Sequence, residues 1–194
     1  ISHSKSPQIH NPALAKQQVN GVYVPFLADS LTEFMSNDET LKLRGLSVTV
    51  PFKNEAARWV GGNGDESVRI TGACNTLYKK GDQWFGKNTD IQGLMTPLLQ
   101  MTGTADLSGW RITLVGAGGA AMGIALGLKQ AGAIVLIVNR TPEKAHQLAE
   151  KFGFAFGKLS DAERIKEFSD IIIQSTSAGM PPQQDVDPLQ AYTF

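Results

Sequence analysis

The sequence predicts an α/β protein of two lobes, and three observations lead to that prediction. Residues 111–115 have the apolar pattern of a buried strand and run into a glycine-rich turn, G-A-G-G-A-A, over residues 116–121. An apolar helix pattern to about residue 131 and a second apolar strand at 134–138 follow the turn. Helix and strand patterns also alternate through the first half of the chain. Such alternation is typical of α/β folds.

We place the first lobe at residues 1–90. Pro51 is expected to start a helix, because proline is well tolerated in a first helical turn. The turn Lys80-Gly81-Asp82 between two apolar runs predicts a hairpin. The helices expected here cover residues 12–19, 31–35 and 52–60, and the expected strands cover 22–27, 46–50, 73–78 and 83–86.

We place the second lobe at residues 91–194. The segment N-T-D at 88–90 precedes an apolar run and is expected to cap a helix over 91–101 that joins the lobes. A doubly wound sheet normally has more strands than those predicted before residue 194, and the chain starts without methionine. We therefore expect a piece of a longer protein, truncated at both ends. After the glycine-rich unit, the patterns predict helices at 143–152 and 162–168 and a strand at 171–174.

The strand, turn, helix and second strand form a βαβ unit with a G-x-G-x-x-A fingerprint, which predicts a dinucleotide-binding, Rossmann-like lobe. Gly116 permits the tight turn, Gly118 lets the backbone approach a pyrophosphate, and Ala121 allows close packing of helix on strand. The helix N-terminus offers free N–H groups to the phosphates. The predicted cofactor contacts in this turn are Gly116, Ala117, Gly118, Gly119 and Ala120.

The end of the second strand indicates which dinucleotide binds. An NAD-dependent enzyme usually places Asp or Glu there, on the ribose 2′-hydroxyl. This chain has Asn139, Arg140 and Thr141 at that point, with Lys144 one helical turn further on. A carboxylate would repel a 2′-phosphate, whereas a guanidinium binds it with two hydrogen bonds. We therefore predict NADP as the cofactor.

Composition excludes several classes of partner and site. Of the 194 residues 42% are hydrophobic, and 18 basic residues balance 18 acidic ones, so neither a nucleic acid nor a membrane is an expected partner. The single cysteine, Cys74, permits no internal disulfide and suits a reducing, cytoplasmic location. Together with three histidines it forms no metal-ligand spacing, so we expect no metal site.

Short polar clusters lie at strand ends and helix starts of the first lobe. Their hydroxyls, amides, single lysine and single carboxylate match the donor–acceptor pattern of a small polyhydroxylated ligand. Taken singly, each has a plainer explanation: Asp90 as a helix cap, Lys53 as a solvated lysine. The candidate substrate-binding residues are Ser4, Ser6, Thr49, Lys53, Asn75 and Asp90.

These clusters and the glycine-rich turn, taken in order, resemble the shikimate dehydrogenase family over essentially the whole chain. The segments that carry the resemblance are S-K-S-P at 4–7, V-T-V-P-F-K at 48–53, G-A-C-N-T at 72–76, N-T-D at 88–90, G-A-G-G-A at 116–120 and N-R-T at 139–141. The resemblance implies reversible, NADPH-dependent reduction of 3-dehydroshikimate to shikimate, in chorismate and aromatic amino-acid biosynthesis. It also implies a small-molecule substrate and a monomer or homodimer.

The resemblance further implies a role for each candidate residue. Lys53 would be the acid–base residue beside Asp90, which would orient the lysine. In the first lobe, Ser4 and Ser6 would bind the substrate carboxylate, while Thr49, Asn75 and Asp90 would hold the ring hydroxyls. In the second lobe, Asn139, Arg140, Thr141 and Lys144 would hold the 2′-phosphate, and Thr176 would line the cofactor path.

Two alternatives stay open. A relative of broader specificity would oxidise quinate as well as shikimate; Ser6 favours shikimate, since quinate-preferring relatives tend to have threonine there. A non-catalytic relative that senses the metabolite would be expected to have lost Lys53 or Asp90, and both are present. The family pattern N-T-D-G ends here in Ile91, which is expected to alter the edge of the site without removing the carboxylate.

Overall fold

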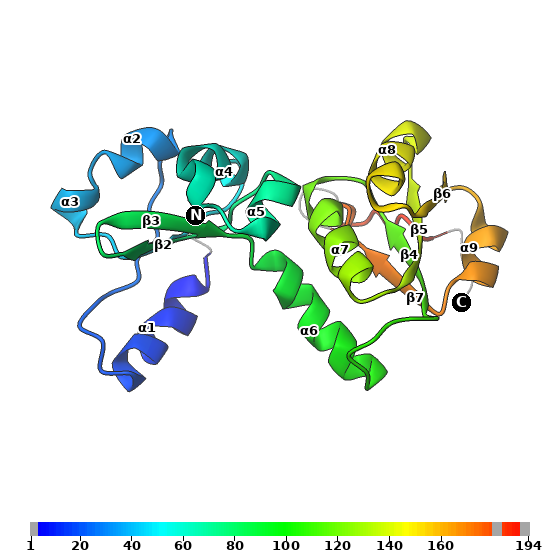
Figure 1. The fold of residues 1–194 in the computed structure, drawn as a ribbon, viewed down its shortest axis with the longest axis horizontal. Helices are drawn as coiled ribbons and strands as arrows, with labels where there is room; N and C mark the ends of the chain where they lie inside the picture. The colour runs from blue at the N-terminus through cyan, green and yellow to red at the C-terminus, as the bar shows by residue number, and fades with distance from the viewer. Residues whose placement is uncertain (1–3, 180–183, 191–194) are drawn as a thin grey trace. The chain divides into compact units, whose positions relative to one another are not determined.

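The protein is described by a computed structural model that covers residues 4–179 and 184–190. The chain divides into two compact units, Ile1–Leu43 and Arg44–Phe194. Helices and strands alternate along it, and its second sheet is parallel, which confirms the predicted α/β class (Figure 1).

The first unit is helical and begins with α1 (Ser6–Lys16). This helix starts six residues before the predicted start at residue 12. The Ser6 N–H donates to Ser4 Oγ at 3.3 Å, and a proline lies in the first turn, where no N–H is needed. Pro12 therefore lies inside the helix rather than at its start. The two short helices that follow are α2 (Leu31–Met35), as predicted, and α3 (Asp38–Leu41).

The strand predicted at 22–27 is wrong. Both backbone groups of Tyr23 pair with one side chain instead of a neighbouring strand: Asn11 Nδ2 donates to the Tyr23 carbonyl at 2.9 Å, and the Tyr23 N–H donates to Asn11 Oδ1 at 2.7 Å. Pro25 has no N–H to give to a ladder. The apolar pattern of this segment is therefore present without the hydrogen bonds that define a strand.

The second unit begins with an antiparallel sheet whose order, over the described residues, is β1-β2-β3. β2 and β3 form the predicted hairpin, with Gly81 and Asp82 between them. β1 is shorter than the strand expected at 46–50, because the chain turns after Val48 and the Phe52 N–H bonds back to the Thr49 carbonyl at 2.9 Å. The strands are β1 (Gly45–Ser47), β2 (Thr76–Lys80) and β3 (Gln83–Lys87).

Helices accompany this sheet. α4 buries Ala56 and Val60 and starts after Pro51, as predicted. α5 was not predicted; the side chain of Asp65 caps it by accepting the Val68 N–H at 3.2 Å. α6 leads from the hairpin to the second sheet, as expected. The bounds are α4 (Lys53–Val60), the 3₁₀ turn η1 (Gly61–Asn63), α5 (Glu66–Thr71) and α6 (Asp90–Thr102).

The second sheet is parallel, and among the described residues its order is β6-β5-β4-β7. The predicted βαβ unit is confirmed, and only β6 lacked a sequence prediction, because A-F-G-K contains no apolar run. The elements are β4 (Arg111–Val115), α7 (Gly119–Gln130), β5 (Ile134–Asn139), α8 (Pro142–Phe152), β6 (Ala155–Lys158), α9 (Ala162–Phe168) and β7 (Ile171–Gln174).

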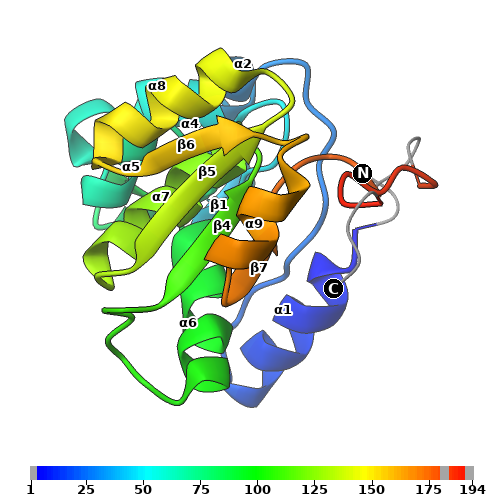
Figure 2. The ribbon, with the colours of Figure 1, turned by 90° about the vertical axis from the view of Figure 1, so that its right-hand side faces the viewer.

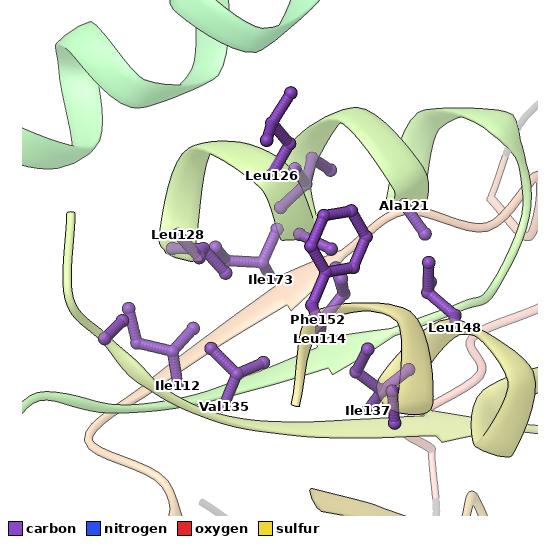
Figure 3. Close-up of a cluster of buried hydrophobic side chains, with 14 of the residues drawn as sticks. Ile112, Leu114, Ala121, Leu126, Leu128, Val135, Ile137, Leu148, Phe152 and Ile173 are labelled. Atoms are coloured by element: carbon purple, nitrogen blue, oxygen red, sulfur yellow. The ribbon is translucent and has the colours of Figure 1, made fainter. Parts of the chain in front are cut away.

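The largest hydrophobic core lies between this sheet and the helices α7 and α8. Phe152 and Leu148 of α8 point into the same cluster as Leu114 and Ile137 of the central strands (Figure 3). A smaller cluster contains Ile165 of α9. Figure 2 shows α9 on the face of the sheet opposite to α7. Covering both faces explains why the strands are apolar throughout rather than alternating.

The strand order indicates where this sheet would bind a ligand. From β4 the chain passes through α7 to β5 on one side, whereas β7 lies on the other side of β4. Open α/β sheets bind ligands beyond the carboxyl ends of their strands, at the point where the strand order reverses. That point lies at the ends of β4 and β7, next to the glycine-rich turn.

Candidate active site

Three of the predicted site residues meet at the end of the antiparallel sheet. Lys53 is the first residue of α4, Asn75 directly precedes β2, and Asp90 is the first residue of α6. Lys53 Nζ lies 2.6 Å from Asp90 Oδ2, and Asn75 Nδ2 donates to Asp90 Oδ1 at 2.7 Å. The side chains of Lys53 and Asp90 are 29% and 54% exposed, so a ligand can reach both ions from solvent.

Backbone hydrogen bonds hold these three segments together. The Cys74 N–H donates to the Lys53 carbonyl at 2.9 Å, which ties the segment before β2 to the start of α4. The Asn75 N–H donates to the Lys87 carbonyl at 3.1 Å, and its carbonyl accepts the Val48 N–H at 2.7 Å. The position of Asn75 is therefore set by both neighbouring strands.

The amide of Asn75 has a defined orientation. Its Oδ1 accepts the Thr89 N–H at 3.0 Å and the Thr76 hydroxyl at 2.8 Å. The Nδ2 group therefore faces Asp90. Thr76 and Thr89 were absent from the predicted site, although they directly follow Asn75 and precede Asp90 in the sequence.

The Asp90 side chain does not cap α6, so the capping explanation offered from sequence is wrong. Thr89 is the N-cap residue, and it makes no side-chain cap. The carboxylate of Asp90 instead accepts hydrogen bonds from Lys53 and Asn75. An ammonium that touches an oriented carboxylate, both open to solvent, is able to give a proton to a bound ligand and take one back.

The other predicted substrate residues lie outside this contact. Thr49 is exposed in the turn between β1 and α4, four residues before Lys53. Ser4 and Ser6 belong to the first unit, where Ser4 precedes α1 and Ser6 is its first residue.

The glycine-rich turn connects β4 to α7, and Gly116 is required there by geometry. Its φ is +112°, a conformation that residues with a side chain rarely adopt. A Cβ at this position would lie 2.6 Å from Ser175 Oγ and 3.0 Å from Thr176 Cγ2. The turn therefore packs directly against the segment after β7, and Thr176 lies beside it.

Gly118 and Gly119 are exposed, and no other segment of the described residues packs against them. A Cβ at either position would meet no heavy atom within 4 Å. These residues precede and start α7, whose first N–H groups have no acceptor within the helix. Open space beside unpaired N–H groups at a helix start fits a phosphate group. Ala117 is half-buried and Ala120 is exposed at the same end.

The cationic residues follow the end of β5. Asn139 is the last residue of the strand, and its Nδ2 donates to the Thr141 carbonyl at 3.0 Å. Arg140, Thr141 and Lys144 are exposed, and Lys144 lies in the first turn of α8. Over residues 4–179 and 184–190, neither Arg140 nor Lys144 forms an ion pair. These two cations and the open helix start fit the phosphates of NADP.

Three further observations concern metal ligands, membrane-spanning helices and the cysteine. Within the part of the chain that the structure describes, no group of three or more His, Cys, Asp or Glu side chains is arranged to hold a metal ion. No helix in that part is long and apolar enough to cross a membrane. Cys74 is free and fully buried, and burial raises the pKa of its thiol, which favours the neutral form.

Comparison with protein families gives two matches. Residues 1–77 match the family described as the shikimate dehydrogenase substrate binding domain. Residues 98–185 match the family described as shikimate / quinate 5-dehydrogenase. The resemblance inferred from the short motifs is thereby confirmed.

Individual relatives agree with these matches. The shikimate dehydrogenase (NADP(+)) of Syntrophobacter fumaroxidans is 38% identical over 182 residues, which cover 93% of this chain and 62% of that protein. That of a Janthinobacterium species is 38% identical over 208 residues, covering 100% of this chain and 71% of that protein. The chain thus spans less than two thirds of the first relative.

A solved structure extends the similarity to the fold. The crystal structure of shikimate 5-dehydrogenase from Listeria monocytogenes, in complex with shikimate and NAD, is similar with a TM-score of 0.84 and 28% identity. The similarity covers 98% of this chain and 70% of that one.

Proposed function

The chain belongs to the shikimate dehydrogenase family, and we propose that its protein catalyses the reversible, NADPH-dependent reduction of 3-dehydroshikimate to shikimate. The observation that carries this proposal is the 2.6 Å contact between the Lys53 ammonium and the Asp90 carboxylate. Reduction of a ketone places negative charge on its oxygen, and a positioned ammonium both stabilises that charge and supplies the proton.

The proposed reaction assigns distinct work to the residues of the cluster. NADPH, when bound, supplies a hydride to the ketone carbon. Lys53 transfers a proton from Nζ to the ketone oxygen, which becomes the new hydroxyl of shikimate. Asp90 orients Lys53 and accepts a hydrogen bond from a substrate hydroxyl. Asn75 holds Asp90 and offers its amide to the ring hydroxyls. In the reverse direction, Lys53 takes the proton back.

Further contacts complete the proposed substrate site. Thr49 would bind a ring hydroxyl from its exposed position ahead of Lys53. Ser4 and Ser6 would hold the substrate carboxylate, and their hydroxyls, at the start of α1, suit that anion. We assign residues 1–90 to substrate binding and 91–194 to the cofactor.

The proposed cofactor is NADP. The pyrophosphate would lie at the start of α7, against Gly116, Ala117, Gly118, Gly119 and Ala120, with Thr176 beside the turn. Arg140 and Lys144 would hold the 2′-phosphate, assisted by Asn139 and Thr141. Support comes from the unpaired state of both cations among the described residues and from the absence of a carboxylate at the end of β5.

A broader specificity for quinate as well as shikimate is the second candidate. The family matched by residues 98–185 is described by both acids. We also propose that the protein is cytoplasmic, since its single cysteine is free. Its formal charge of zero supports the proposal that neither a nucleic acid nor a membrane is a partner. The family resemblance supports a monomer or homodimer.

One assay tests the function and separates the candidates. The full-length protein is given shikimate or quinate with NADP⁺ or NAD⁺, and formation of the reduced nicotinamide is followed by absorbance. We expect the highest kcat/KM with shikimate and NADP⁺. Comparable values with quinate would establish the broader specificity, and no reduction with any pair would contradict the proposal. Analytical ultracentrifugation of the same sample gives the oligomeric state.

A further inference from the structure

Asn88 is an unusual residue in this protein because its polar side chain is buried. Among the described residues, the buried polar side chains are those of Asn88, which is 7% exposed, and Thr113, which is fully buried. A buried amide is costly unless its groups are hydrogen-bonded. Asn88 lies two residues before Asp90, and its Oδ1 accepts the Asp90 N–H at 3.1 Å.

The other bonds of Asn88 go to α5. Its N–H donates to Ser67 Oγ at 3.0 Å, and its Nδ2 donates to Thr71 Oγ1 at 3.3 Å. The Ser67 hydroxyl gives its own hydrogen to Asp65 Oδ1 at 2.5 Å, and the Thr71 hydroxyl gives its hydrogen to the Ser67 carbonyl at 2.6 Å. Both hydroxyls therefore accept from Asn88. This arrangement fixes the amide so that its oxygen faces Asp90.

The Thr71 hydroxyl also contacts the segment that carries Asn75. It accepts the Ala73 N–H at 3.3 Å, two residues before Asn75. One oxygen atom thus holds two segments, one leading to Asn75 and the other to Asp90. The side chains of those two residues meet at 2.7 Å beyond it.

We propose that Thr71 and Asn88 are positioning residues: the Thr71 hydroxyl, acting through the Asn88 amide, holds the Asp90 carboxylate against Lys53 and Asn75. Neither residue touches the substrate, so their effect is on the geometry of the proton donor. The inference rests on the proposed function, because it concerns the reaction assigned to Lys53.

The experiment compares three variants of the full-length protein. Thr71→Val removes the hydroxyl at nearly constant shape, and Thr71→Ser restores it. Thr113→Val is the matched control, because it also removes a buried hydroxyl. Thr113 lies in β4 of the parallel sheet, and its hydroxyl is 2.6 Å from Ser169 Oγ, just after α9. Concentrations are corrected for the folded fraction by titration with NADP⁺.

We expect Thr71→Val to lower kcat for shikimate oxidation about tenfold or more and to raise KM for shikimate, since small misplacements of catalytic groups have effects of that size. KM for NADP⁺ should stay unchanged. Thr71→Ser should recover most of the loss, and Thr113→Val should leave kcat per folded molecule unchanged. A Thr71→Val enzyme within about twofold of wild type in kcat/KM overturns the inference.

Crystal structures of the same variants keep the test independent of activity. In Thr71→Val the Lys53 Nζ to Asp90 Oδ2 distance should exceed about 4 Å, the limit of an ion pair, whereas Thr71→Ser should retain the pair. If wild type fails to oxidise shikimate, the proposed function fails, and these distances alone decide the positioning role. An intact pair in Thr71→Val contradicts that role.

Discussion

The cluster of Lys53, Asn75 and Asp90 and the glycine-rich turn of this protein are built in opposite ways. At the cluster, Lys53, Asn75 and Asp90 already satisfy one another through side-chain hydrogen bonds. At the turn, Gly118 and Gly119 leave open space, and Arg140 is exposed without an ion pair among the described residues. One region is organised before its ligand arrives, whereas the other presents unpaired groups that an anion can complete.

This difference has a physical basis in what each region must do. A proton donor has to stay within hydrogen-bond reach of one atom, so its geometry benefits from fixed partners. A phosphate carries several acceptor oxygens and a full charge, so N–H groups and cations need only be available. Changes in the cluster should therefore reduce kcat, and changes at the turn should reduce cofactor affinity or folding.

The largest expected effect is that of Lys53→Ala. Removing the proposed proton donor should lower kcat by about 10²–10⁴, the usual contribution of general acid–base catalysis, while NADP⁺ still binds. Steady-state kinetics with shikimate and NADP⁺ and a separate fluorescence titration measure the two quantities. Lys166→Ala, on the exposed side of α9, is the matched control. An unchanged kcat in Lys53→Ala would remove the lysine from the mechanism.

Gly116→Ala tests the glycine that, among Gly116, Gly118 and Gly119 of the turn, has a close contact and a positive φ. A side chain at φ +112°, with its Cβ 2.6 Å from Ser175 Oγ, should lower the free energy of unfolding by about 2–4 kcal/mol. Urea denaturation measures the change. Gly93→Ala serves as the control: inside α6 its Cβ meets nothing within 4 Å, so it should raise stability by about 0.5–1 kcal/mol. A Gly116→Ala variant as stable as wild type would contradict the packing argument.

Arg140→Ala should affect cofactor affinity alone. Loss of hydrogen bonds to a charged phosphate costs about 1.5–3 kcal/mol, which corresponds to a rise of about 10- to 100-fold in KM for NADP⁺. KM for NAD⁺, which lacks the 2′-phosphate, should not change. Arg58→Ala, exposed in the last turn of α4, provides the control. A parallel rise for both cofactors would show that Arg140 acts elsewhere than on the 2′-phosphate.

The smallest effect concerns a cation that is already paired. At the other end of β4, Arg111 Nη2 lies 2.7 Å from Asp170 Oδ1, and the side-chain hydrogen bond from Arg111 lowers the pKa of Asp170 below its ordinary value of 3.8. Since the carboxylate is favoured in the folded state, this stabilisation is complete above pH 3.8 and is lost as pH falls through the lowered pKa.

Asp170→Asn tests this pH dependence. Wild type should be slightly more stable than the variant at neutral pH, and the gap should close as pH falls below the ordinary Asp value. Chemical denaturation of both proteins across that range measures the gap, with only a small difference expected because the pair is exposed. A gap that is constant with pH would mean that the ion pair does not contribute to stability.

Sequence reasoning succeeded where the signal is local. The βαβ unit, the hairpin and the start of α4 follow from periodicity, turn residues and proline, each within about ten residues. It failed at residues 22–27, where strand residues lack a strand partner because the amide of Asn11 bonds to Tyr23. The helix predicted at 12–19 was also misplaced: α1 begins at Ser6, with an earlier proline in its first turn, and includes Pro12 in its interior.

The candidate site shows the same contrast between residues that the sequence predicts and residues that only the structure reveals. The motifs identified Lys53, Asn75 and Asp90, because their residue types are distinctive and match a known family. Thr76, Asn88 and Thr89 lie within those motifs but received no role from them, and Thr71 lies outside them. Their hydrogen bonds to the segments that carry Asn75 and Asp90 appear only in the structure. Threonine and asparagine are common in turns, so their presence near a motif predicts no particular partner.

By itself, the sequence determined the α/β class, the glycine turn with its cationic neighbours and the residue types of the polar cluster. Local periodicity and turn chemistry carry that information, since they depend on residues close together in the chain. Only the tertiary structure decided that Lys53 meets Asp90 across 37 positions and that the amide of Asn75 bonds to the same carboxylate. Those contacts depend on the register of the hairpin and on where α4 and α6 begin, and long-range hydrogen bonds set both.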